Sequence, residues 1–289
     1  MHRRWSVGEL SKELGIAAPT LRTWERRYGV GPTFRTDGGH RRYTIVDADR
    51  VATLARLIDD GLPARAAADL VRTMPASEIA AAAADRRQTP REYALLGILG
   101  GAKALDGLRI RDTAVTVLER FGIVDGWDEV LAPALIEVGR RWETGELGVE
   151  GEHLVSTMVL EALRQISRRH LLTRPARVVS ASAPDDQHRT PVAALTAALA
   201  ERGHAVTELG ARTPADALAT FVAATDPDVV FVWSSLEMPR DEHLDLLLGL
   251  GDRTTLLLGG PGWPDDVVTS HSLRQTVDQV MGALSGDLG

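Results

Sequence analysis

Cysteine is absent from this chain of 289 residues, which excludes a disulfide framework, a thiolate metal site and a cysteine nucleophile. Long apolar runs are absent too, since no stretch approaches the 18 residues that a membrane-spanning helix requires. The first residues lack the apolar segment of a signal peptide, so we expect a cytoplasmic protein that does not associate with a membrane. Apolar residues nevertheless make up 44% of the chain, and its length predicts two or three domains with substantial cores.

Positive charge is concentrated at the N-terminal end. Residues 1–42 contain nine Lys or Arg and four Asp or Glu, a net charge of +5, whereas the whole chain carries −7 and the remainder therefore −12. A basic head on an acidic body is typical of a DNA-binding protein whose other domains have a different task.

The basic head contains two apolar stripes at helical spacing. They are Val7, Leu10 and Leu14, then Leu21, Trp24 and Tyr28. Gly15 and Ile16 interrupt the first helix, and Pro19 lies where the first turn of a second helix tolerates proline. Two short helices joined by a tight turn indicate a helix-turn-helix, in which we expect Leu21 and Trp24 to be core residues.

A hairpin signal follows the second helix. Asp37-Gly38-Gly39 separates two short basic segments, which predicts a wing that grips the DNA backbone or minor groove. The alternative is a small helical domain with an ordinary solvated arginine face. The candidate DNA-contacting side chains are Thr20, Arg22, Arg26 and Arg27 in the second helix, and Arg35, His40, Arg41, Arg42 and Tyr43 in the hairpin.

Two segments of the head, LRTWERRYG and RTDGGHRRY, resemble the MerR family of winged-helix transcription regulators. The resemblance covers residues 5 to about 74 and implies a double-stranded DNA operator as the partner. Members of that family that sense metals do so through cysteines, so the absence of cysteine excludes that type of sensor.

The centre of the chain has helical periodicity. Residues 1–75 form the predicted DNA-binding domain, which ends with helices at 45–60 and 62–74, and the Ala-rich residues 76–90 are expected to be a helical connector without coiled-coil heptads. Apolar stripes at 91–104, 108–121, 127–141 and 149–171 predict a four-helix bundle spanning 91–174.

The period changes after Pro175. Short apolar segments at 177–180, 204–209, 228–233 and 254–258 alternate with predicted helices at 190–202, 213–224, 240–250 and 276–285. Such alternation indicates a doubly wound parallel sheet in residues 175–289. The chain is thus expected to be a multidomain α and α/β protein: a winged helix-turn-helix, a four-helix bundle and a parallel-sheet domain.

Polar or glycine-containing loops follow three of the strands, at the edge where doubly wound sheets bind ligands. Asp186 precedes His188 by two residues, so its carboxylate can bind one ring nitrogen of His188 and leave the other to a metal. Ser234 can hydrogen-bond a ligand, and the glycines Gly259 and Gly260 permit a bulky ligand to approach the backbone. Taken alone, a histidine in such a loop is more often an ordinary surface residue, and paired glycines after a strand are more often an ordinary turn.

Taken in order, these loops resemble the Asp-x-His-x-x-Gly, Ser-x-Leu and Gly-Gly pattern of cobalamin-binding domains. Asp186 and His188, Ser234 and Leu236, and Gly259 and Gly260 match that pattern, whereas Pro191 stands where the family has glycine. The resemblance implies cobalamin as the cofactor and His188 as the lower ligand of its cobalt ion.

Residues of the expected bundle extend this resemblance. Trp142 is followed ten residues later by Glu152 and His153, which is similar to the cap over cobalamin in light-sensing repressors of the CarH/LitR type within the MerR family. The alternative is a core tryptophan and an ordinary acidic helix start. Those repressors carry histidine directly after the tryptophan, where this chain has Glu143, and a carboxylate suits cobalt less well than an imidazole.

The resemblance implies a DNA-binding repressor and photoreceptor that binds adenosylcobalamin and acts as a homo-oligomer, a dimer or tetramer that light dissociates. Pro191 and Glu143 leave a second hypothesis open, in which a regulator of the same architecture has lost cobalamin and responds to another ligand or a partner protein. A cobalamin enzyme is the third hypothesis, and the absence of a separate substrate domain argues against it.

Overall fold

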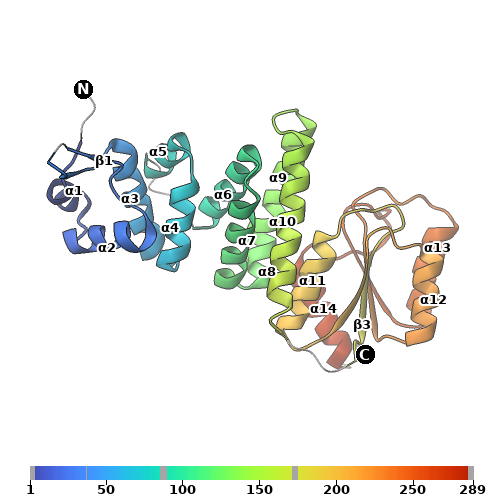
Figure 1. The fold of residues 1–289 in the computed structure, drawn as a ribbon. Helices are drawn as coiled ribbons and strands as arrows, with labels where there is room; N and C mark the ends of the chain where they lie inside the picture. Colours follow the sequence, from blue (N-terminus) through green and yellow to red (C-terminus); the bar gives the residue numbers. More distant parts are fainter. Residues whose placement is uncertain (1–3, 37, 85–89, 171–174, 286–289) are drawn as a thin grey trace. The chain divides into compact units, whose positions relative to one another are not determined.

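The computed structural model describes residues 4–36, 38–84, 90–170 and 175–285. Figure 1 shows the order of its helices and strands. By packing, the chain divides into two compact units. The first comprises Met1–Arg120 and Pro133–Val155, and the second comprises Phe121–Ala132 and Ser156–Gly289. In the described ranges, no helix combines the length and apolar character needed to cross a bilayer.

The head begins with the expected pair of short helices, α1 (Val7–Leu14) and α2 (Ala18–Tyr28). Ser6 and Glu9 form a reciprocal capping box at the start of α1, and Gly15 ends this helix with a φ of 70°. Leu21 is buried and Trp24 packs against the same core, as predicted from their spacing. The helix-turn-helix is therefore confirmed.

The predicted wing is also present. Strands β1 (Phe34–Arg35) and β2 (Arg41–Arg42) pair antiparallel, with Phe34 opposite Arg42. Asp37, part of the predicted turn, lies outside the described residues. The guanidinium of Arg4 lies 3.9 Å from the centre of the Phe34 ring and supports the outer face of the hairpin.

Three helices complete the core of the head: α3 (Ile45–Asp59), α4 (Ala64–Thr73) and α5 (Ala76–Ala84). The last of them is more than a connector, because Ile79 and Ala82 are fully buried in the core of the head. Arg56 strengthens this packing by donating to the carbonyl of Ala82 at 2.8 Å. Small side chains suffice here because they let α5 approach α3 closely, so the head extends beyond residue 75.

The four predicted helices of the central region are present with altered ends. They are α6 (Pro90–Ala104), α7 (Gly107–Phe121), a run made of α8 (Ile123–Gly126), the π-helix η1 (Trp127–Leu131) and α9 (Ala132–Glu143), and α10 (Val149–Ser167). By packing, α6, α7 and α9 belong to the first unit, whereas α8 and η1 belong to the second. Periodicity reveals an apolar stripe and does not reveal which partner covers it.

A buried arginine joins the helical region to the head within the first unit. The side chain of Arg109 in α7 is only 2% exposed and pairs with Glu78 of α5 at 3.2 Å. It also donates to the carbonyl of Thr73 at the end of α4, at 2.9 Å. A Cβ at Gly100 would lie 2.6 Å from this guanidinium, so glycine makes room for it.

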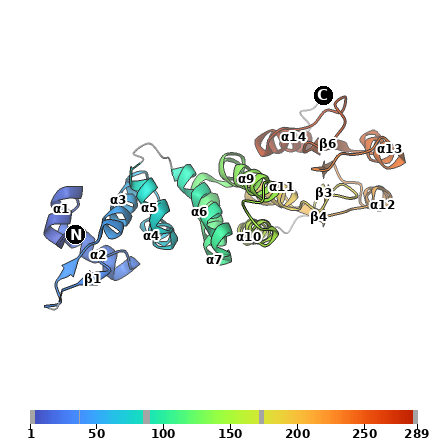
Figure 2. The same ribbon diagram turned by 90° about the horizontal axis from the view of Figure 1, so that it is seen from above.

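The second unit contains a parallel sheet in the order β4-β3-β5-β6. Helices α11 and α14 cover one face, and α12 and α13 cover the other (Figures 1 and 2). The predicted alternation of strands and helices is confirmed. The strands are β3 (Val178–Ser182), β4 (Val206–Gly210), β5 (Val229–Trp233) and β6 (Thr255–Gly259), and the helices are α11 (Thr190–Glu201), α12 (Ala215–Thr225), α13 (Glu242–Leu248), followed by the 3₁₀ turn η2 (Gly249–Asp252), and α14 (Leu273–Ser285).

This strand order places a topological switch point between β3 and β5. From β3 the chain continues to β4 on one side and later returns to β5 on the other side. Doubly wound sheets bind ligands in the crevice at the carboxyl ends of two such strands. The loop after β3 contains His188, and the loop after β5 contains Ser234 and Leu236, so both lie where the fold favours a ligand.

Candidate functional site

A buried carboxylate holds the loop that follows β3. The side chain of Asp186 is fully buried, and its Oδ1 lies 2.7 Å from His188 Nδ1. The same oxygen accepts the backbone N–H of His188 at 2.7 Å, and Oδ2 accepts the N–H of Ser235 from the loop after β5. One acid therefore links the two loops at the switch point.

Burial alone would raise the pKa of Asp186, but hydrogen bonds from the His188 ring, the Ser235 N–H and the His188 N–H lower it below its ordinary value. The carboxylate is ionised at neutral pH and can only accept, so it keeps the proton of the imidazole on Nδ1. Nε2 then carries the lone pair that a metal ligand needs, on a side chain that is 56% exposed. The expected pairing of Asp186 with His188 is present.

Two further residues fix this loop and were missed by sequence reasoning. The hydroxyl of Ser182, the last residue of β3, donates to the carbonyl of His188 at 2.8 Å. The backbone N–H of Arg212, in the loop after β4, donates to the carbonyl of Asp186 at 2.8 Å. A serine at the end of a strand is the only signal that the sequence offers for the first contact.

Ser234 is used differently from our expectation. It is fully buried, and its hydroxyl donates to the carbonyl of Leu236 at 2.7 Å, so it shapes its own loop. The side chain of Leu236 remains 47% exposed at this edge of the sheet. A buried hydroxyl must find a partner, and a carbonyl two residues away is the nearest acceptor.

The paired glycines bring two loops together. A Cβ at Gly260, which has a φ of 96°, would lie 2.1 Å from the carbonyl oxygen of Ser234. A Cβ at Gly259 would lie 2.9 Å from the Phe231 ring. We expected these glycines to admit a ligand, and the contacts here are with the protein itself. Gly262, which sequence reasoning did not single out, is equally constrained against Leu236.

The candidate cap residues belong to the first unit, whereas His188 belongs to the second. Trp142, near the end of α9, is 49% exposed, which excludes the alternative of a core tryptophan. Glu152 Oε2 lies 2.6 Å from His153 Nδ1 in the first turns of α10, and the His153 side chain is 75% exposed. Glu143 is exposed beside Trp142.

The head presents its basic residues on α2 and the wing, which lie side by side (Figure 2). Arg22, Arg26 and Arg27 are exposed on α2, as are Arg35 and His40 on the hairpin, while Thr20, Arg41 and Arg42 are partly exposed. Glu25 of α2 binds Arg35 at 2.8 Å and Arg41 at 2.6 Å. This carboxylate fixes the wing beside the second helix, a role that the sequence did not reveal.

Tyr43 requires a correction. It is fully buried in the core of the head and exchanges backbone hydrogen bonds with Trp5. Burial, followed by the charge of Glu25, raises the pKa of its phenol to about 12. Its ring therefore supports the wing from inside, and we remove it from the candidate DNA contacts.

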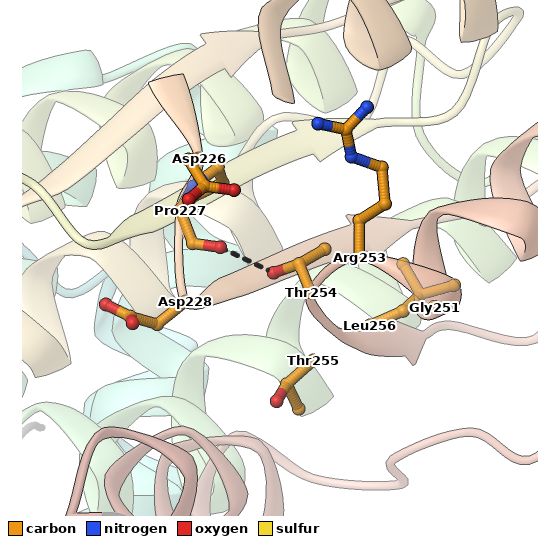
Figure 3. A pocket seen from close by; sticks show the side chains of 8 residues that line it. All are labelled: Asp226, Pro227, Asp228, Gly251, Arg253, Thr254, Thr255 and Leu256. Carbon is orange, nitrogen blue, oxygen red and sulfur yellow. Dashed lines mark hydrogen bonds between the residues drawn. The ribbon is translucent and has the colours of Figure 1, made fainter. Parts of the chain in front are cut away.

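A pocket of about 610 Å³ lies at the opposite edge of the sheet, at the amino ends of β5 and β6 (Figure 3). Asp226, Asp228 and Arg253 line it, and Thr254 donates to the carbonyl of Pro227 at 2.8 Å. This edge lacks the features of the switch point. In the described ranges, no group of three or more His, Asp or Glu side chains could hold a metal ion.

Two family models match the chain, and they correspond to two of its regions. Residues 5–73 match the MerR HTH family regulatory proteins, and residues 102–167 match a B12 binding domain. The first match covers the helix-turn-helix and the wing. The second covers the helical region that contains Trp142, Glu152 and His153.

Relatives match over most of the length. The chain is 34% identical to the HTH-type transcriptional repressor CarH of Myxococcus xanthus, over 90% of this chain and 88% of CarH. It is 35% identical to the repressor CarA of the same organism, over 78% of this chain and 74% of CarA. The monomethylamine corrinoid protein of Methanosarcina barkeri aligns with a TM-score of 0.45 and 15% identity, over 65% of this chain and 95% of that protein.

Both named relatives are described as transcriptional repressors. An identity above 30% over nearly the full length settles the family. The chain belongs to the MerR family of helix-turn-helix regulators and, within it, to the CarH-type transcriptional repressors that join such a head to a B12 binding domain.

Proposed function

We propose that this regulator represses transcription from a double-stranded operator and that adenosylcobalamin, bound at the carboxyl edge of the sheet, sets its affinity for DNA. The observation that carries the proposal is the pair of Asp186 and His188 at the switch point. A buried, ionised acid there fixes the tautomer of a half-exposed imidazole. Metal-binding histidines commonly have such a partner, and a lone surface histidine does not need one.

The residues at this edge fit cobalamin. Cobalamin would supply a cobalt ion that an imidazole can bind. Imidazole nitrogen suits cobalt, and Nε2 of His188 is the candidate ligand atom. Leu236 offers an exposed apolar surface near the carboxyl end of β5, and Ser234 holds the loop that presents it. Gly259 and Gly260 act indirectly, by allowing the loop after β6 to pack against that loop.

The upper side of the cofactor would be covered by Trp142, Glu152 and His153. A half-exposed indole favours a flat, bulky partner, since such a surface is costly to leave in water. The adjacent Glu152 and His153 offer polar groups for a ribose. Glu143, in the position where light-sensing relatives carry a histidine, is a poor ligand for cobalt. This chain would therefore offer no second histidine beside Trp142 as a ligand of the metal.

DNA binding is assigned to α2 and the wing. Thr20, Arg22, Arg26 and Arg27 would contact base edges and phosphates, and Arg35, His40, Arg41 and Arg42 would hold the backbone. One head makes few contacts, so affinity depends on several heads acting together. A cofactor that stabilises a dimer or a tetramer would therefore raise DNA affinity without touching the head.

The test is reconstitution of the purified chain with adenosylcobalamin in darkness. We expect a corrinoid absorbance band that survives desalting, a larger assembly by light scattering, and tighter operator binding than for the chain without cofactor. His188→Ala should lose the retained band, whereas Arg26→Ala should keep it and bind the operator more weakly.

A flat visible spectrum after desalting would contradict the proposal. It would favour the second candidate, a regulator of the same architecture without cobalamin. The observation behind that candidate is Pro191, which lies in the first turn of α11 directly after the His188 loop, where it removes an N–H and adds bulk. In that case His188→Ala should change neither assembly nor DNA binding.

A further inference from the structure

The helical run from Ile123 to Glu143 is irregular where it passes from one compact unit to the other. The π-helix η1 occupies Trp127–Leu131, and the division between the units falls between Ala132 and Pro133. Single π-turns are rare and occur frequently at functional sites. Pro133 has no N–H and so removes one hydrogen bond from the same turn. The regular α-helical hydrogen-bond pattern is therefore interrupted near the point where the run changes units.

Two acidic side chains of this segment bind the start of α14, about 145 residues later in the chain. Asp128 accepts hydrogen bonds from the backbone N–H groups of Leu273 at 2.9 Å and Arg274 at 3.1 Å. Asp125 forms an ion pair with the Arg274 guanidinium. All of these residues belong to the second unit.

This contact differs from an ordinary N-cap. An ordinary cap comes from the residue directly before the helix, as Asp241 does for α13, and at α14 that place belongs to Ser272, which accepts the N–H of Gln275 at 3.1 Å. Asp128 adds a second acceptor, which is charged and lies at the positive end of the helix dipole. Two of the N–H groups that a helix leaves unpaired at its start are thus bound by a distant helix.

We propose that Asp128 is a positioning residue, which holds the segment of α8 and η1 on α14 and so supports the start of the helical run that continues into α9. Helix α9 carries Trp142 near its other end, so the contact of Asp128 with α14 acts on Trp142 through this continuous run. This inference rests on the proposed function, in which Trp142 covers the cofactor. If Trp142 binds the cofactor more tightly while Asp128 contacts α14, then bound cofactor must stabilise the contact of Asp128 with α14 by the same free energy.

The test compares Asp128→Ala and Asp128→Asn with the wild-type chain, in darkness, by hydrogen exchange and by the rate at which adenosylcobalamin dissociates. In Asp128→Ala we expect faster exchange in the first turn of α14 and throughout residues 123–143, and several-fold faster dissociation of the cofactor. Asparagine also accepts hydrogen bonds from a helix start, so Asp128→Asn should restore most of both properties. Arg274→Gln removes only the ion pair with Asp125 and should give a smaller change of the same kind.

Asp241→Ala is the matched control, because it removes an aspartate cap from α13 of the same unit. It should raise exchange only near residues 241–252 and leave cofactor dissociation unchanged. Faster exchange confined to α14 in Asp128→Ala, with unchanged dissociation, would reduce Asp128 to a local cap and overturn the inference. A wild-type chain that binds no adenosylcobalamin would instead overturn the proposed function, while exchange in residues 123–143 would still test the contact of Asp128 with α14.

Discussion

The DNA-binding head and the carboxyl edge of the sheet expose their candidate residues in opposite ways. On the head, Arg22, Arg26 and Arg27 lie on the surface of α2, and the wing adds further charges beside them. At the sheet edge, Asp186 and Ser234 are almost completely buried, and the His188 side chain that Asp186 holds is 56% exposed. A polyanion is bound by many accessible charges, whereas a metal ion needs one atom held in one place.

This difference predicts how each region tolerates substitution. Loss of one charge on the head removes one of several similar contacts, so the effect should be graded. Loss of one buried group at the sheet edge disturbs every group bonded to it.

Asp186→Ala should have the largest effect, although Asp186 is not itself a ligand of the cofactor. The substitution removes the acceptor that orients His188, and loss of such a partner commonly weakens metal binding by about 10–100-fold. It also leaves the Ser235 N–H without its partner, which should lower the free energy of unfolding by about 1–3 kcal/mol. Equilibrium titration with adenosylcobalamin and urea unfolding measure the two effects. Binding as tight as that of the wild-type chain would show that the acid does not orient the histidine.

Alanine substitution of two glycines with positive φ compares the backbones of the two regions. Gly260→Ala places a Cβ 2.1 Å from the Ser234 carbonyl, so it should destabilise the sheet unit by at least about 3 kcal/mol. Gly39→Ala, in the wing, meets no atom within 4 Å, so it should cost only the strain of a left-handed residue, about 1–2 kcal/mol. Hydrogen exchange resolves the stability of each region separately. Equal losses of stability in the two variants would mean that the loops after β5 and β6 relax as easily as the wing.

The sequence predicts the parts of this molecule that depend on local pattern. Helix periodicity and turn residues give the helix-turn-helix and the wing, and the alternation of strands and helices gives the sheet. Once the sheet is doubly wound, its topology brings the loops with His188 and Ser234 to one edge. The pairing of Asp186 with His188 was predictable because two residues is the span of a short turn.

Contacts that depend on tertiary packing could not be predicted. Tyr43 was assigned to DNA because it ends a basic segment, yet it fills the core of the head. The Ala-rich α5 was predicted to be a connector, and its small side chains are what let it pack in the core of the head. The contact of Asp128 with α14 joins segments about 145 residues apart, and no local pattern marks it.

Arg41→Ala tests the graded behaviour expected of the head. If Arg41 binds a phosphate, its loss should weaken binding to all sequences by a few-fold and lower the dependence of log K on log salt by about 0.9. Arg27→Ala is the comparison variant, because Arg27 lies in α2 and does not pair with Glu25. Arg41 also binds Glu25, so its loss should loosen the wing, and Arg41→Ala should lower affinity somewhat more than Arg27→Ala at the same change in slope. A change in the preferred operator without a change in slope would assign Arg41 to a base edge.

Tyr43→Phe should have the smallest effect on DNA binding, because the ring lies in the core and cannot reach DNA. In the described part of the chain its hydroxyl has no hydrogen-bond partner, so at neutral pH its removal should change the stability of the head by less than about 1 kcal/mol. The substitution should instead change how the stability of the head depends on pH above pH 10. The pKa of this phenol is raised to about 12 in the folded head, against about 10 in an unfolded chain, so the stability that it contributes is complete below pH 10 and is lost as the pH rises toward 12. Tyr43→Phe should remove this loss of stability at high pH, whereas the control Tyr28→Phe should retain it. A clear drop in operator affinity in Tyr43→Phe would return Tyr43 to the DNA interface.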